Sequence, residues 1–295
     1  MEKVVQLTIW SKVGGCVVPL LVIIFSSIEI HILRRVRNKS FYEKILLSLT
    51  FCDLLHGIYA TLAVPFLSIA KVEIHINYWI VWVFIVSYFM LNTIMHLIIL
   101  CIDRLWSVAA PLHHRIYASN RKLYMAVILS WFIPTIYPVT HITAVLLQGM
   151  NAYQIYIYTR TTMAKCMAHI FIVADVTLVF SYCAIIFVLL KKKSLGKQSR
   201  QPAQMQYLNA VILCIGIALV FVTATTPYVV AHLIDWSVPH WLVKFSIILL
   251  HLNQLLNSLL YLIQKGRAKR TVHVVVVAKE NNCTTRKGPY ADTHL

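Results

Sequence analysis

Residues 78–105, YWIVWVFIVSYFMLNTIMHLIILCIDRL, form a long apolar block with no Asp, Glu, Lys or Arg before Asp103. A stretch of about 18 or more apolar residues is long enough to cross the hydrocarbon layer of a membrane as a helix. Inside lipid every backbone N–H and C=O must be paired within the chain, and the strands of a membrane barrel would be shorter and would alternate. We therefore expect this block to be a membrane-spanning helix.

Six further apolar blocks accompany it, at residues 13–33, 44–67, 123–147, 167–190, 207–233 and 241–263. The chain is 59% hydrophobic and 13% charged, which is about half the charged fraction of a soluble domain. These features predict an all-α membrane protein built as a seven-transmembrane helix bundle. The expected parts are a short extracellular N-terminus (1–12), the bundle (13–263), and a cytoplasmic juxtamembrane helix and tail (264–295), with the longest outer loop at about 148–166.

The formal net charge of +17 is spread over short clusters between the apolar blocks. Most of the 27 Lys and Arg residues follow the first, third, fifth and seventh blocks, so the positive-inside rule predicts an extracellular N-terminus and a cytoplasmic C-terminus. The basic segment 264–270 suits a helix lying on anionic membrane lipid, with a solvated tail as the alternative. Nucleic acid is not an expected partner, because no basic stripe with interleaved aromatic residues is present.

Polar residues lie well inside several of the predicted spans. Ionisable groups within a membrane are costly, so each is a functional suspect. Asp53 lies in the middle of the second block, where a carboxylate needs a cation, a proton or polar partners, and a purely structural, hydrogen-bonded Asp53 remains the alternative. Glu29 and His31 lie near the inner end of the first block, where we expect a polar tip to reach the interface.

Short motifs recur in order along the seven blocks. The second block contains LSLTFCDLL (47–55), the third ends in IDRL (102–105) with Pro111 and Leu112 after it, and the seventh ends in NSLLY (257–261). Single residues complete the series: Trp131, Phe171, Tyr182, Phe221 and Pro227. In this order they resemble the motifs of rhodopsin-like (class A) G-protein-coupled receptors over roughly residues 15–270, so the chain is identified as a divergent, orphan-type member of that family.

The resemblance implies roles for several residues. Arg104 would be held by Asp103 at rest and, on activation, freed to meet Tyr182 and the tail of a heterotrimeric G protein. The implied switch set is Asp103, Arg104, Tyr182, Asn257, Tyr261, Phe221 and Pro227. The implied cation pocket, for which sodium is the candidate ion and the sole expected cofactor, is Asp53, Thr93, Asn253 and Asn257; oxygen ligands of this kind suit a hard cation or a chain of water molecules.

The chain departs from the family pattern at several switch positions. The first-helix Asn is replaced by Ser26 or Ser27, and no Cys stands near Trp79 at the outer end of the third block. Cys166 is therefore left unpaired or meets Cys16. The remaining departures are Leu105 for Tyr, Ala174 for Pro, Thr225 for Trp and Ser258 for Pro.

The predicted ligand-binding residues are Val86, Ser87, Asp175, Thr225 and His251. Val86 stands where amine receptors carry a carboxylate, and His251 stands where retinal pigments carry the Schiff-base Lys. An unknown extracellular ligand that is neither a biogenic amine nor retinal is therefore expected. The His residues also suit plain helix packing as satisfied buried polar groups.

The predicted function is that of a plasma-membrane receptor, with no enzyme activity. A seven-helix transporter or channel is the alternative; it would predict internal repeats or helices broken at matched positions, which the sequence lacks. An intramembrane enzyme would predict paired Asp residues or Ser–His pairs at helical spacing, whereas the His residues are scattered. A receptor-like protein without G-protein signalling also stays open, because the sixth-helix Trp and the seventh-helix Pro are missing.

Overall fold

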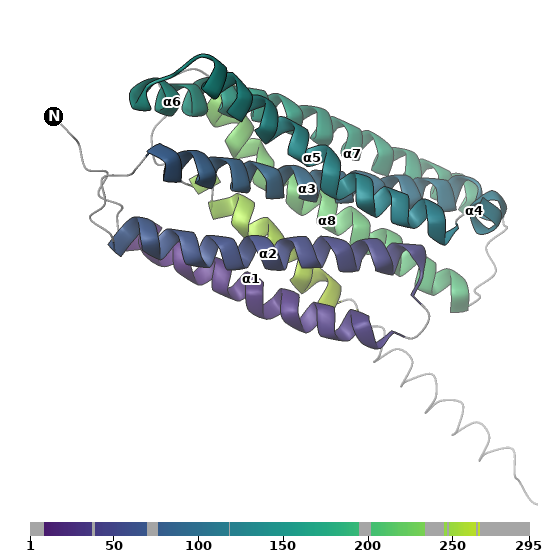
Figure 1. Ribbon diagram of the computed structural model, residues 1–295. Coiled ribbons are helices and arrows are strands. Elements are labelled where there is room, and N and C mark those ends of the chain that lie inside the picture. Colours follow the sequence, from purple (N-terminus) through teal and green to yellow (C-terminus); the bar gives the residue numbers. More distant parts are fainter. Residues whose placement is uncertain are drawn as a thin grey trace, which may run out of the picture.

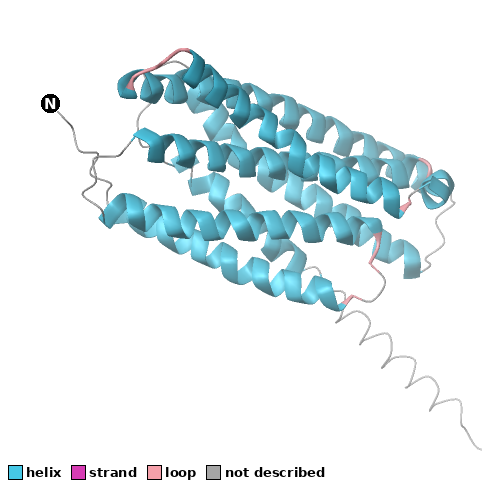
Figure 2. Ribbon diagram, viewed as in Figure 1, coloured by secondary structure: helices cyan, strands magenta, loops and turns pink. Residues whose placement is uncertain are grey.

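The computed structural model describes residues 9–36, 39–69, 76–117, 119–194, 202–233, 245–246, 248–263 and 265. Six long helices run side by side in it (Figure 1): α1 (Ile9–Arg35), α2 (Phe41–Ile69), α3 (Ile76–Ala109), α5 (Asn120–Leu147), α7 (Ala164–Ser194) and α8 (Pro202–Leu233). The remaining elements are α4 (Pro111–Tyr117), α6 (Ala152–Tyr158), the π-helical turn η1 (Thr159–Met163) and a last apolar helix, Ile248–Ile263. Over the described residues no strand is present, as Figure 2 shows.

The predicted all-helical membrane bundle is confirmed. Within the described residues, six helices are long and apolar enough to cross a membrane, and Ile248–Ile263 is a shorter apolar helix. This last helix lies in the seventh predicted block, of which residues 241–244 and 247 fall outside the described part. The predicted tail, 266–295, and the start of the chain also lie outside it.

Local sequence sets where the helices begin. Before α2, the Ser40 N–H donates to Glu43 Oε2 (2.9 Å) and the Glu43 N–H donates to Ser40 Oγ (3.3 Å). This reciprocal pair is a capping box, which satisfies backbone donors that the first helical turn leaves unpaired. At the start of α5, the Lys122 N–H donates to Ser119 Oγ (3.4 Å) in the same way.

The segment 148–166, predicted as the longest outer loop, is largely helical. After α5 the chain turns at Gly149, whose φ of 56° is in the left-handed region that glycine adopts without strain. Asn151 and Gln154 then cap each other's backbone N–H groups at 2.9 and 3.0 Å, and helix continues from α6 through η1 into α7. The polar residues 159–162 interrupt the hydropathy signal, but their backbone is still satisfied within a helix.

Helix α3 is the centre of the bundle. It contacts α2, α5, α7 and α8, while α1 packs along α2. Gly57 permits the close approach of α1 to α2, because a Cβ there would lie 3.1 Å from Val22 Cγ1 and 3.3 Å from the Pro19 carbonyl oxygen. Small residues at helix contacts are a common means of packing helices in membranes.

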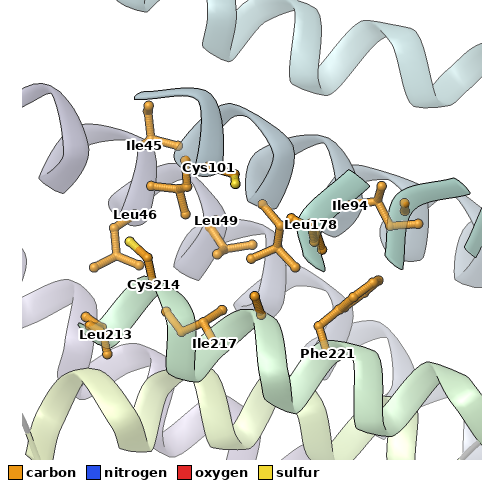
Figure 3. Packing of buried hydrophobic residues seen from close by; sticks show 14 of the residues in the cluster. Ile45, Leu46, Leu49, Ile94, Cys101, Leu178, Leu213, Cys214, Ile217 and Phe221 are labelled. Atoms are coloured by element: carbon orange, nitrogen blue, oxygen red, sulfur yellow. The ribbon is translucent and has the colours of Figure 1, made fainter. Parts of the chain in front are cut away.

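Apolar side chains from α2, α3, α7 and α8 pack against one another in the interior of the bundle (Figure 3). Leu49, Ile94 and Leu178 are fully or nearly fully buried there. The outer faces of α5 and α7 instead expose large apolar side chains, among them Phe132 and Phe180. Such faces suit lipid contact, and the chain is accordingly a multi-pass membrane protein.

Candidate functional site

Asp103 and Arg104 form a buried ion pair near the C-terminal end of α3. The Arg104 Nη2 atom pairs with Asp103 Oδ2, and Arg104 Nε donates to the same oxygen at 3.0 Å. The other carboxylate oxygen, Oδ1, accepts from His114 Nε2 of α4 at 2.8 Å. Both oxygens of Asp103 are thus engaged, which ties α4 to the end of α3.

Besides Asp103, the ring of Tyr42 contacts Arg104. The guanidinium carbon of Arg104 lies 4.6 Å from the centre of the Tyr42 ring, which belongs to α2 and is buried. A guanidinium over an aromatic face is a cation–π contact, which is stronger where water is excluded. Neither Tyr42 nor His114 was predicted from the sequence, since no local motif reports a contact between α2, α4 and α3.

The three aromatic residues of the predicted switch set, Tyr182, Phe221 and Tyr261, are buried in the bundle. Tyr182 and Tyr261 are 7% and 4% exposed, and the Tyr261 hydroxyl has no hydrogen-bond partner within the described part of the chain. Phe221 packs edge-on against Phe171 at 6.2 Å. Pro227 lies inside α8, one residue before Tyr228. The structure therefore groups the aromatic switch residues in the interior, and their signalling roles stay predictions.

The predicted cation residues come together from three helices. Asp53, Thr93, Asn253 and Asn257 are all buried, and the Thr93 and Asn257 side chains lie beside the Asp53 carboxyl. In the described part of the chain, Asp53 Oδ1, Asn253 Oδ1 and both side-chain polar atoms of Asn257 lack hydrogen-bond partners. Orphaned buried oxygens of this kind call for a ligand or a water molecule, so the donor set fits a hard cation.

Glu29 does not reach the membrane interface, so that prediction is wrong. Helix α1 continues to Arg35, and Glu29 is turned inward, only 1% exposed, with its carboxyl beside the hydroxyls of Thr50 and Ser258. One turn earlier, Ser26 Oγ lies 3.4 Å from Ser258 Oγ. Of the two serines proposed to replace the family Asn, Ser26 therefore faces the bundle, while Ser27 is exposed.

A second polar contact lies one turn from Asp53. His56 is fully buried, and its Nδ1 accepts from the Gln254 side-chain amide. The His56 ring stacks on Phe89 and lies 5.2 Å from the His251 ring. His251, a predicted ligand residue, is thus part of a histidine pair between α2 and the last helix.

Trp131 and His96 tie three helices together. His96 Nδ1 lies 2.8 Å from the carbonyl oxygen of Asn92, so Nδ1 carries the proton and Nε2 accepts from Ser48 at 2.8 Å. Ser130 Oγ lies 3.2 Å from the same Nε2 and donates to the Val127 carbonyl at 2.7 Å. The Trp131 ring N–H donates to Ser48 Oγ at 3.0 Å. This fully bonded network explains the buried histidine as packing between α2, α3 and α5.

Two of the predicted ligand residues bond to each other. The Thr225 hydroxyl lies 2.9 Å from Asp175 Oδ2, which joins α7 to α8 where the family carries a Trp. Thr225 is fully buried and Asp175 half-buried. Ser87 is also buried, and Val86 packs on the apolar core. The predicted ligand residues therefore lie at three places. Asp175 and Thr225 join α7 to α8, His251 belongs to the histidine pair, and Val86 and Ser87 lie on α3.

The outer end of α5 contains a smaller polar contact. The Tyr158 hydroxyl lies 2.7 Å from His141 Nδ1, and Tyr137 donates to the Met163 carbonyl at 2.6 Å. Burial raises the pKa of the Tyr158 hydroxyl. Cys166 nearby is an exposed free cysteine.

The sequence motifs that resemble those of the receptor family lie in order on α2, α3, α5, α7, α8 and the last helix. The profile of the family described as 7 transmembrane receptor (rhodopsin family) matches residues 31–261, most of the 295-residue chain. No curated protein matches the chain. The matched segment extends from α1 to Tyr261, and it includes the Asp103–Arg104 pair and the Asp53 cluster. The chain therefore belongs to the rhodopsin family of seven-transmembrane receptors.

Proposed function

We propose that this protein is a plasma-membrane receptor that couples binding of an extracellular ligand to activation of a heterotrimeric G protein. Its N-terminus is outside and its C-terminus is in the cytoplasm, as the distribution of Lys and Arg requires. The observation that carries the proposal is the buried Asp103–Arg104 pair at the end of α3. Family membership favours this function over a transporter, a channel or an enzyme.

The pair acts as the resting restraint of a two-state helix arrangement. Arg104 is held by the Asp103 carboxylate and by the Tyr42 ring. A ligand shifts such an equilibrium only if it binds the active arrangement more tightly than the resting one. Release of Arg104 would leave it free to meet the G protein and Tyr182, which is buried in the same core as Cys101.

The altered positions support a modified transmission route. Thr225 replaces the aromatic side chain that the family carries in its sixth helix, and it bonds Asp175 of α7 instead. This hydrogen bond joins α7 to α8 directly, whereas an aromatic side chain at the same position would contact its neighbours by packing. Ligand-induced movement of α8 would therefore either break this hydrogen bond or move α7 together with α8.

The ligand is neither a biogenic amine nor retinal. Val86 offers no carboxylate for an ammonium group, and His251 offers no amine for a Schiff base. His141 and Tyr158, which bond each other, offer polar groups that would hydrogen-bond a ligand at this end of the bundle. A sodium ion, held by the oxygens of Asp53, Thr93, Asn253 and Asn257, would neutralise the buried carboxylate and stabilise the resting bundle.

Agonist-free G-protein activation in cells tests the proposal. The wild type is compared with Arg104→Ala and with Arg34→Ala, a matched change of an exposed Arg at the inner end of α1. All versions are expressed at equal surface levels with each major G-protein class. We expect basal activation that Arg104→Ala abolishes and Arg34→Ala retains.

Basal activation that persists in Arg104→Ala would contradict the assigned role of the ion pair. Surface protein without activation of any G protein, in the wild type and in Asp103→Asn alike, would instead favour a receptor-like protein without G-protein signalling. Asp103→Asn is informative there because it removes the anionic partner of Arg104.

A further inference from the structure

We propose that Tyr137, His141 and Tyr158 form a hydrogen-bonded clasp that keeps the α6–η1 segment, residues 152–163, closed over the end of the bundle where α3 begins. When the clasp is released, this segment opens as a unit while α7 stays in place. The inference goes beyond the receptor function proposed above and relies on it only for placing this end of the bundle outside the cell.

The α6–η1 segment has no covalent tie to the rest of the bundle besides its own chain connections. The sequence contains no cysteine between Cys101 and Cys166, and Cys166, which follows the segment in α7, is a free thiol. The segment is therefore held by packing and hydrogen bonds alone. Contacts of this kind break and re-form when a part of a protein opens locally.

One face of the segment packs on the bundle. Ile155, Thr159 and Met163 follow one another at intervals of four residues and are 6%, 5% and 2% exposed. Residues at this spacing lie on one side of a helix. Helix α6 contacts α3, and Figure 1 shows it at the end of the bundle where α3 begins. The segment therefore covers this end of the bundle.

Two hydrogen bonds from α5 hold the segment in this position. The Tyr158 hydroxyl at the end of α6 lies 2.7 Å from His141 Nδ1, and the Tyr137 hydroxyl donates to the Met163 carbonyl at the end of η1 at 2.6 Å. Tyr137 and His141 are one turn apart on α5, and their rings meet edge to face with centres 4.5 Å apart. The clasp thus contacts the segment at two places, from one rigid helix.

The apolar packing that resists opening is small. Of the α6 side chains that the structure describes, Ile155 alone is buried, and Tyr153 and Gln154 are exposed. Regions with few buried apolar contacts open at a small fraction of the global free energy of unfolding. The two hydrogen bonds of the clasp therefore contribute a large share of the closing free energy.

The backbone sets the limits of the unit that opens. On one side the chain turns at Gly149, whose φ of 56° suits glycine. On the other side lies η1, where the Ala164 N–H bonds to the Thr159 carbonyl in a π-helical turn. Such turns are rare and have poorer geometry than the α-helix. Opening should therefore extend from Gly149 through η1 and stop where α7 begins.

Hydrogen exchange, followed by mass spectrometry on the purified receptor in lipid nanodiscs, tests the clasp. Tyr158→Phe and Tyr137→Phe each remove one hydroxyl and keep the ring. The net contribution of one hydrogen bond corresponds to an increase of about 2- to 13-fold in the open population. Exchange of the α6–η1 amides should accelerate by this factor in each single variant and by the product of the two factors in the double variant.

Tyr153→Phe is the matched control, because Tyr153 belongs to the same helix and is 72% exposed. Its exchange should equal that of the wild type, and the amides of α2 and α7 should be unchanged in every variant. Unchanged α6–η1 exchange in both Tyr158→Phe and Tyr137→Phe would overturn the proposal. Equal acceleration in α2 and in the α6–η1 segment would also overturn it, since the loosening would then be global.

Trypsin cleavage after Arg160, which lies in η1, gives an independent measurement. Cleavage of a transiently open form follows the population of that form, so the fragment ending at Arg160 should appear faster by the same factors. Equal cleavage rates in the wild type and the double variant would refute the clasp. Neither measurement needs a ligand or a G protein, so a failure of the clasp and a failure of the proposed receptor function are distinguishable.

Discussion

Replacement of Tyr42 by Leu should raise the basal activity of the receptor. The ring of Tyr42 lies under the Arg104 guanidinium at 4.6 Å, and both side chains are buried. Leu fills a similar apolar space but presents no aromatic face. The resting position of Arg104 therefore loses one of its restraints while the Asp103 contact remains.

The size of the effect follows from the contact. A cation–π interaction contributes about 0.5–1 kcal/mol at exposed sites and about 2 kcal/mol when desolvated. A loss of about 1–2 kcal/mol from the resting state changes the resting-to-active ratio by about 5- to 30-fold. Basal G-protein activation, measured per receptor at the cell surface, should rise accordingly as long as the active state remains the minor one.

Tyr42→Phe is the matched control. It keeps the aromatic face, and the hydroxyl that it removes has no hydrogen-bond partner within the described residues. Tyr42→Phe should therefore signal like the wild type. Equal basal activity in Tyr42→Leu and the wild type, or equal elevation in Tyr42→Phe and Tyr42→Leu, would refute the assignment of the ring to the restraint.

Three further outcomes follow from the packing, all measured by thermal unfolding in detergent. Gly57→Val should destabilise the bundle by about 1–3 kcal/mol through overpacking against Val22, whereas an unchanged midpoint would mean that α1 is free to move away. Thr225→Val should cost about 1–3 kcal/mol because the Asp175 carboxylate loses its donor; the loss should vanish in an Asp175→Ala background. His96→Phe should destabilise more than an exposed His169→Phe change, since it breaks bonds to α2 and α5.

The helices were predictable because hydropathy depends on composition over a long window. Hydropathy fails where polar residues form a helix, as at η1, which precedes the predicted fifth block and lies in the segment expected to be a loop. The apolar blocks therefore indicate the spans. The start of the helix that leads into the fifth span is set by the capping pair of Asn151 and Gln154, which hydropathy does not detect.

The site was only partly predictable for a related reason. Asp103 and Arg104 are neighbours in the chain, so a motif reports them directly. Tyr42 and His114 reach the same pair from α2 and α4, and such contacts depend on how helices cross. Glu29 lies near the end of its apolar block, and this position alone predicts a side chain at the membrane interface. Its spacing from Ser26 and Leu33 instead places it on the face of α1 that is buried against the bundle.

The contacts around Asp103 show how a divergent receptor can keep a restrained resting state. Leu105, Thr225 and Ser258 remove parts that the family uses elsewhere, yet Asp103 engages both Arg104 and His114. The Tyr42 ring adds a cation–π contact to the Arg104 guanidinium. Since these restraints come from α2, α3 and α4, motion of any of these elements relative to the others weakens the hold on Arg104. The resting state therefore depends on the packing around Arg104, so mutations of its partners Tyr42 and Asp103, or of His114, should raise basal activity more than mutations in the outer half.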